Sequence, residues 1–235
     1  METSLLRNAL TTVDWNSHVQ GFLDDVPSAH TIIQCNLRLA IWSKQFEGAD
    51  KSNPALSFIR EMQAAGHYAA VLTSLALYKP SAAAIRTVLE TALYYTYFRT
   101  HPTELATLVR SEDYYLQRTD IIDYHRKHTP NFMQFQNCFG LLGRMQTWYS
   151  WISSIIHGQI PGVWTTHQSI SEIKHIPENM KAVVEAFSQG EALVHDLFLC
   201  TVGVELRGSF SSTAKRKLLR GLPGETKTTL KLDSA

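Results

Sequence analysis

Apolar residues recur along most of the chain at intervals of three and four, the spacing that places them on one face of an α-helix. Short breaks containing proline or glycine, such as Pro27, Gly48 and Pro80, separate these stretches. No stretch alternates apolar and polar residues as a half-buried strand does. The pattern predicts a single all-α bundle of about six to eight helices. The expected helices span residues 3–26, 28–48, 53–78, 81–99, 103–125, 132–139, 141–157 and 178–206.

The helix expected over residues 81–99 is apolar around most of its circumference, which is typical of a central helix. It carries one arginine and one glutamate, Arg86 and Glu90, whose spacing of four places them one turn apart on the same face. Tyr94 continues this stripe. A charged pair on a central helix is costly unless it is partnered. Arg86 and Glu90 are therefore expected either to fix the packing of the core or to line a functional site.

The apolar helix expected over residues 141–157 carries a second polar stripe near its end. Ser150, Ser154 and His157 follow one another at spacings of four and three, and Ser153 flanks them. His157 either interacts with the negative end of the helix dipole or acts as a general acid or base, because its charge changes near neutral pH. The serines either contact a substrate or are small residues that allow close packing.

If these two apolar helices pack together, their polar stripes must meet or remain unsatisfied. Glu90 would then orient the His157 imidazole, and Arg86 would bind a phosphate or a carboxylate. Arg86, Glu90 and His157 are therefore the first candidate catalytic group. The candidate substrate contacts in the body are Ser150, Ser153 and Ser154.

Charge is distributed unevenly along the chain. From residue 208 onward there are six lysines and arginines against two acidic residues, so this end carries +4 while the first 207 residues carry −3. The body therefore lacks the strongly basic surface of a duplex-DNA-binding protein. The composition predicts a domain over residues 1–207 and a flexible basic tail over residues 208–235. Lys215, Arg216 and Lys217 in this tail either hold substrate phosphates electrostatically or are simply solvated.

Three cysteines without paired spacing, and a start that lacks the apolar core of a signal peptide, predict a cytoplasmic protein. No run of about 18 apolar residues is present to span a membrane. Asp123, His125 and His128 lie close enough in sequence to converge on a metal, but such clusters near a helix end are commonly surface residues. We therefore expect neither a metal nor another cofactor.

The residues Arg86-Thr-Val-Leu-Glu90 and Ser153-Ser154-Ile-Ile-His157-Gly158 resemble motifs of divergent branches of the HEPN superfamily, small all-α domains of prokaryotic toxins and antiviral defence. The similarity covers roughly residues 28–205 in helix order. It implies a helical bundle, frequent dimerisation, and RNA as the usual partner or substrate. Active members of the family cut RNA without a metal, with an arginine and a histidine separated by four to six residues and commonly assembled across a dimer interface.

The sequence departs from the family pattern before His157, because the nearest upstream arginine is Arg144. Arg118 and His125 do have six residues between them, although they lie in a charged helix earlier in the chain than the motif of the family. They form the second candidate catalytic pair.

These observations leave two classes of function open. The first is a metal-independent endoribonuclease of toxin or defence type, in which a histidine takes the 2′-hydroxyl proton and an arginine stabilises the phosphate charge. The second is a non-catalytic helical module, a homodimer or a subunit of a larger defence assembly, that binds RNA, protein or a small ligand. The many aromatic residues of the two apolar helices would form its interface.

Overall fold

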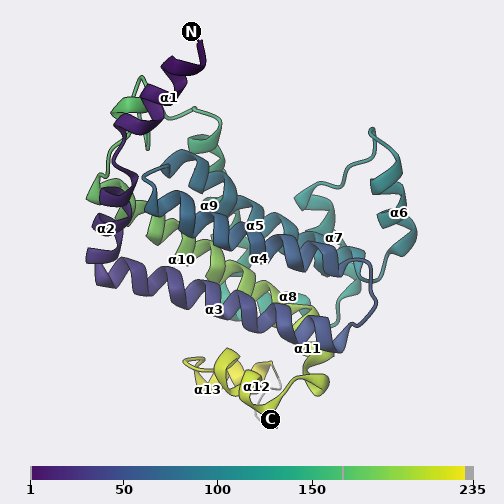
Figure 1. Cartoon of the computed structure of the whole chain (residues 1–235). Helices are drawn as coiled ribbons and strands as arrows, with labels where there is room; N and C mark the ends of the chain where they lie inside the picture. Colours follow the sequence, from purple (N-terminus) through teal and green to yellow (C-terminus); the bar gives the residue numbers. More distant parts are fainter. Residues whose placement is uncertain (1, 166, 231–235) are drawn as a thin grey trace.

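The computed structural model describes residues 2–165 and 167–230, and within them the chain is helical with no strand (Figure 1). The predicted all-α class is therefore confirmed. No helix in this described part is both long enough and apolar enough to cross a membrane. The α-helices are α1 (Glu2–Thr12), α2 (Trp15–Asp24), α3 (Val26–Ala49), α4 (Leu56–Ser74), α5 (Tyr78–Phe98), α6 (Pro102–Arg110), α7 (Arg118–His128), α8 (Phe132–Phe139), α9 (Leu141–Ile156), α10 (Pro177–Cys200), α11 (Val202–Leu206), α12 (Ser212–Leu218) and α13 (Gly224–Thr229). Two short 3₁₀ helices, η1 (Ile170–Glu172) and η2 (Arg207–Ser209), complete the set.

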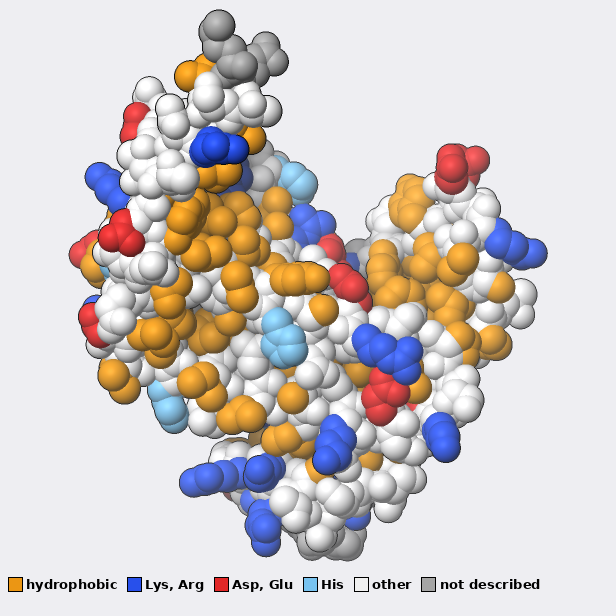
Figure 2. Space-filling view, in the orientation of Figure 1, with side chains coloured by type: hydrophobic (Ala, Val, Ile, Leu, Met, Phe, Trp, Pro, Cys, Tyr) orange, Lys and Arg blue, Asp and Glu red, His pale blue; other side chains and the backbone are white. Residues whose placement is uncertain are grey.

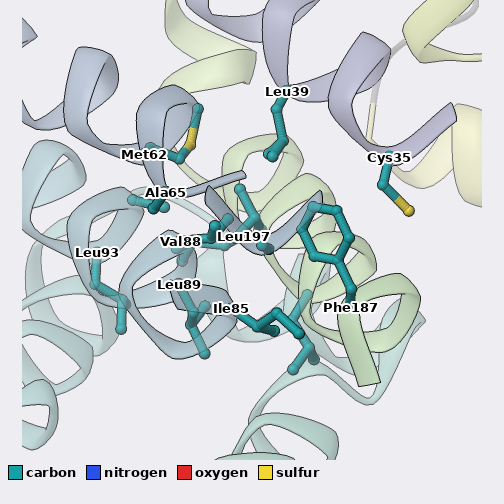
Figure 3. Packing of buried hydrophobic residues seen from close by; sticks show 14 of the residues in the cluster. Cys35, Leu39, Met62, Ala65, Ile85, Val88, Leu89, Leu93, Phe187 and Leu197 are labelled. Atoms are coloured by element: carbon teal, nitrogen blue, oxygen red, sulfur yellow. The ribbon is translucent and has the colours of Figure 1, made fainter. Parts of the chain in front are cut away.

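The centre of the molecule is formed by α3, α4, α5 and α10, and α5 is the central helix as the sequence predicts. It packs against α4 and α10, and also against α9 and α7. Figure 3 shows apolar side chains from the four central helices meeting in one cluster. Each of those named below is at most 2% exposed, so together they provide much of the stabilisation of the bundle. They are Leu39, Met62, Ala65, Ile85, Val88, Leu89, Leu93, Phe187 and Leu197.

Helix α10 also buries a row of polar side chains, and each has a partner on another helix. Arg38 of α3 forms a two-pronged ion pair with Glu191, with Nε donating to Oε1 over 2.6 Å. Trp42 donates from Nε1 to His195 Nδ1 over 3.1 Å, and Arg144 of α9 donates to Asp196 over 2.7 Å. Burial, with the nearby Arg38 charge, lowers the pKa of His195 to about 3, so its ring stays neutral and Nδ1 can accept the hydrogen bond from Trp42. The buried polar residues of α10 are Glu191, His195 and Asp196.

Three of the expected helices are interrupted, so the described part contains more helices than predicted. The first divides at Val13 because Asp14 caps a new helix, accepting a hydrogen bond from Ser17 N over 3.0 Å. The helix expected over residues 103–125 ends at Arg110 and restarts at Arg118, after an irregular segment at residues 111–117. The last long helix breaks at Thr201. In the connection between α9 and α10, the described residues 159–165 and 167–176 contain η1 and no other helix.

The segment predicted as a flexible tail is folded over its described part, which corrects that expectation. Residues 207–230 form η2, α12 and α13 below the end of α3 (Figure 1). Phe210, Ala214, Leu218 and Leu230 are buried, and the Phe210 ring meets the Trp42 ring edge-on at 5.9 Å. Apolar burial therefore holds this segment against the bundle. The remaining residues, 231–235, lie outside the described part.

The close approach of α9 and α10 leads to a stability prediction. A Cβ added at Gly190 would lie 2.5 Å from Trp148 Cζ2. The indole cannot move freely, because its Nε1 donates to the Ala186 carbonyl oxygen over 3.1 Å. Gly190→Ala should therefore lower the free energy of unfolding by about 1–3 kcal/mol, measured by urea denaturation.

The matched control is Gly143→Ala on α9, where an added Cβ would meet nothing within 4 Å. Because alanine is the better helix former, this variant should be as stable as the wild type or gain up to about 1 kcal/mol. Equal stabilities for Gly190→Ala and Gly143→Ala would contradict the tight packing of α10 on Trp148.

Candidate functional site

Helices α5 and α9 lie side by side and bring together the three residues of the first candidate group. Arg86 and Glu90 form an ion pair, with Arg86 Nε and Nη2 at 2.9 and 2.8 Å from Glu90 Oε1. Arg86 Nη1 lies 3.2 Å from His157 Nε2. Two residues 71 positions apart in sequence therefore share one hydrogen bond, and Arg86 links the carboxylate to the imidazole.

The nature of the contact between Arg86 and His157 depends on which imidazole nitrogen carries a proton. A guanidinium can only donate hydrogen bonds, so the contact is a hydrogen bond when His157 Nε2 carries no proton. His157 is exposed at the C-terminal end of α9, and its backbone N–H donates to the Ser153 carbonyl oxygen over 2.9 Å. The arrangement therefore places an exposed imidazole directly beside a guanidinium that Glu90 holds in position.

Tyr149 is a further residue of this site that the sequence analysis did not select. Its hydroxyl donates to Glu90 Oε1 over 2.5 Å. Burial, with the hydrogen bond and charge of Glu90, raises the pKa of Tyr149 to about 12, so the hydroxyl keeps its proton at neutral pH. A sequence signal was present, because Tyr149, Ser153 and His157 are spaced by four and so share one face of α9.

Arg118, from the second candidate pair, also belongs to this site. Its Cζ lies 4.6 Å from the centre of the Tyr149 ring, and the Cζ of Arg86 lies 4.8 Å from the same ring, so two guanidinium groups contact one aromatic side chain. Arg118 Nη2 also donates to Gln146 Oε1 over 2.8 Å. Burial alone would lower the pKa of Arg86, but the hydrogen bond and charge of Glu90 outweigh this effect and raise it, so both arginines are cationic.

A cavity of about 330 Å³ opens beside these residues, between α5, α9 and the start of α7. Its polar walls are formed by Glu90, Arg118 and Tyr149, with Tyr94 and Leu116 among the other lining residues. Figure 2 shows a hollow between the main body and the arm that contains α6. The irregular segment at residues 111–117 turns the chain back and so delivers Arg118 to the cavity.

His125 is not part of this site, which corrects the second candidate pair. Its ring is 2% exposed, and its two nitrogens lie 2.8 Å from Thr96 Oγ1 and 2.7 Å from Thr129 Oγ1. Both nitrogens therefore have protein partners, while Arg118 points to Tyr149 instead. Among the described residues no group of three or more His, Cys, Asp or Glu side chains is placed to hold a metal, and this includes the cluster around Asp123.

The buried His125 predicts a loss of stability in acid. Burial, with the charge of His101, lowers the pKa of His125 from 6.5 to about 4 in the folded state. The unfolded chain therefore binds the proton first, so this stability is present above pH 6.5 and is lost as the pH falls toward 4. From pH 7.5 to pH 5 the contribution of His125 to this loss should be about 2 kcal/mol, measured by urea unfolding at both pH values.

His195, whose pKa is also lowered, adds a second contribution of the same sign. The glutamine of the His125→Gln variant cannot titrate, so the change between the two pH values should shrink by about 2 kcal/mol, while the part that comes from His195 and His175 remains. An unchanged pH dependence of the stability in this variant would contradict the lowered pKa of His125. Because the comparison is made within each protein, a lower overall stability of the variant does not affect it.

None of the three candidate serines of α9 lines the cavity beside Tyr149. Ser150 accepts a hydrogen bond from Gln146 over 3.1 Å, and Ser154 donates to the Trp151 carbonyl oxygen over 2.7 Å. The Ser153 hydroxyl is buried and has no partner in the described part. Ser153 is therefore the one of the three whose hydroxyl has no hydrogen-bond partner among the described residues.

The basic residues of the C-terminal segment lie elsewhere. Lys217 lines a different cavity, between α3, α10 and α12, and Lys215 borders a small pocket beside Trp42. Arg216 is exposed and lines neither. None of the three lines the cavity beside Tyr149.

Comparisons of the chain with protein-family models, with curated proteins and with solved structures give no match. The resemblance to the HEPN superfamily therefore rests on the two motif-bearing helices. What the site does has to be inferred from its own geometry.

Proposed function

We propose that the chain is a HEPN-like protein of prokaryotic antiviral defence or toxin type that binds RNA beside Tyr149 and cleaves it without a metal ion. The observation that carries this proposal is the 3.2 Å contact between Arg86 Nη1 and His157 Nε2, with the second guanidinium of Arg118 on the same tyrosine ring. Cleavage through the 2′-hydroxyl requires a base at that hydroxyl and positive charge at the phosphate. His157 and the two arginines supply both within one site.

In the proposed reaction the Arg86 guanidinium turns from His157 to the phosphate of the bound RNA, and the freed Nε2 of His157 takes the proton of the 2′-hydroxyl. The 2′-oxygen then bonds to the adjacent phosphorus, the bond from phosphorus to the 5′-oxygen breaks, and a 2′,3′-cyclic phosphate is left. Protonated His157, or water, returns a proton to the 5′-oxygen. Arg86 and Arg118 stabilise the negative charge on the non-bridging oxygens. Glu90 positions Arg86, and the Tyr149 hydroxyl in turn holds Glu90.

The charge balance of the site supports an anionic ligand. Arg86 and Arg118 are cationic, and Glu90 is the one carboxylate among the described residues that line the cavity. One net positive charge therefore remains, partly shielded from water, where it attracts a phosphate more strongly than it would at an open surface.

The test is cleavage of single-stranded RNA by purified protein in EDTA, with mass spectrometry of the product ends. The wild type should leave 2′,3′-cyclic phosphates, and His157→Ala should not cleave. The matched control is His67→Ala, the same change at an exposed histidine on α4, which should cleave like the wild type. Absence of cleavage by the wild type, or equal cleavage by His157→Ala, would contradict the proposal.

The second candidate function is a non-catalytic subunit of a defence assembly, or a homodimer, that binds RNA, protein or a small ligand. The observation in its favour is the apolar face of α1, where Leu5, Leu6 and Leu10 are 70%, 54% and 42% exposed. Helix α1 packs mainly against η1 and extends from the body (Figure 1). Light scattering should then show a dimer that Leu6→Lys dissociates, whereas a monomer at high concentration would count against the dimer.

A further inference from the structure

A second cavity, of about 470 Å³, lies between α3, α10 and the C-terminal segment. It shares no lining residue with the cavity beside Tyr149. Figure 2 shows lysine and arginine side chains gathered along this lower edge of the molecule, over the region of α12. Three cations line it, together with groups that donate or accept hydrogen bonds. The cations are Arg38, Lys217 and Arg220, and the uncharged polar residues are Thr31, Gln34 and Ser188.

Arg38 is held in place from beneath by a buried carboxylate. Glu191 is 1% exposed and pairs with Nε and Nη2 of the guanidinium, while the Arg38 side chain is 36% exposed. The third nitrogen, Nη1, donates to no atom of the described residues. A guanidinium fixed in this way has lost its side-chain freedom before a ligand arrives, so binding through Nη1 costs less entropy.

Lys217 and Arg220 add positive charge that no carboxylate of the described residues neutralises. Both are exposed, and neither forms an ion pair with a described residue. Among the described residues that line the cavity Glu191 is the only acidic one, and it is paired with Arg38. The cavity therefore carries about two uncompensated positive charges, which favours a ligand with a multiply charged anionic group.

An apolar surface borders these charges. Leu37 and Ile41 of α3 line the cavity, and Leu37 is 50% exposed, which leaves a large apolar side chain uncovered beside the cations. A volume of this size is in the range of pockets that hold small organic ligands. A ligand with an anionic end and a flat, weakly polar end would match both parts.

We propose that this cavity binds a small molecule of the nucleoside di- or triphosphate class. Its phosphates contact Arg38, Lys217 and Arg220, and its base covers Leu37. Because Arg38 belongs to the bundle while Lys217 and Arg220 belong to the C-terminal segment, the ligand bridges the two and stabilises the segment against the body. The site is separate from the one proposed to cleave RNA and does not depend on that activity.

The experiment is isothermal titration calorimetry of the full chain with ATP, with pyrophosphate and with adenosine. ATP should bind most tightly, and its affinity should fall as salt rises. Lys217→Ala/Arg220→Ala should weaken ATP by about tenfold or more, since each lost charged contact is worth at least about 1 kcal/mol. The control, Lys215→Ala/Arg216→Ala, removes the same charge from the same C-terminal segment outside this cavity and should bind nearly as the wild type does.

Three outcomes would overturn the proposal. The first is no binding of ATP or pyrophosphate at millimolar concentration. The second is an equal loss in both double variants, which would show that the charge of the segment matters and the cavity does not. The third is binding of an RNA oligonucleotide that requires Lys217 and Arg220 while ATP fails to bind, which would place a polymer there. All four substituted residues are partly or fully exposed, so the variants should fold, and circular dichroism checks this.

Discussion

Replacing Arg86 by alanine is expected to lower the rate of the proposed RNA cleavage about 100- to 1,000-fold, because the transition state loses a positioned cation. Removing Arg86 also leaves Glu90 without its partner beside the cavity, where its negative charge repels phosphate. The fold should be little affected, since a partly exposed pair one turn apart contributes less than about 1 kcal/mol. The measurements are kcat and KM for an RNA substrate, with urea unfolding of the same sample.

The double variant Arg86→Ala/Glu90→Ala separates the two effects. If Arg86 contacts the transition state, the double variant stays as inactive as the single one. If Arg86 serves only to neutralise Glu90, the double variant regains activity, and the catalytic assignment is wrong. Arg60→Ala is the matched control, because it breaks an exposed arginine–glutamate pair with Glu47 on the surface and should leave cleavage unchanged.

Trp42→Ala should lower the free energy of unfolding by about 3–5 kcal/mol, the range for removing a large aromatic side chain from a core. Trp42 is 1% exposed, and its ring contacts those of Phe46, Phe198 and Phe210 at 5.2–5.9 Å. The substitution also leaves His195 Nδ1 buried without its donor. A domain is commonly stable by only about 5–15 kcal/mol, so this variant should be close to unfolding at 37 °C.

Urea denaturation followed by circular dichroism measures this loss, and Trp151→Ala is its control. Trp151 is 38% exposed and meets Trp164 edge-on at 5.6 Å, so much less apolar surface is lost on its removal. We expect less than half the effect of Trp42→Ala. Similar losses in the two variants would contradict the central position of Trp42.

Helical periodicity predicted most of the fold because apolar faces dominate the long helices. The central position of α5 follows from its apolar circumference. The break at Asp14 was readable, since aspartate is a favoured N-cap, but the restart after Gln117 was not, because glutamine is not a favoured cap. The sequence also indicated a helix in the C-terminal segment, because Phe210, Ala214 and Leu218 are spaced by four.

The candidate site was only partly predictable. The meeting of Arg86 with His157 followed from the polar stripes of two apolar helices, each of which needs a partner. The position of Arg118 beside the cavity could not be predicted, because it depends on the conformation of the irregular residues 111–117, which have no periodic pattern. The burial of His125 could have been anticipated from Ile121 and Ile122, which lie four and three residues before it on one face of α7.

The pairing of α3 with α10 has a consequence during synthesis on the ribosome. Arg38 and Trp42 find their partners 153 residues later in the chain. At elongation rates of about 5–20 residues per second, α3 waits roughly 8–30 seconds before α10 has been made. During that time α4 and α5, which are neighbours in sequence, can already pair, while the α3 face that later contacts α10 stays uncovered. The nascent chain thus passes through a stage in which a chaperone would find apolar surface that the finished protein conceals.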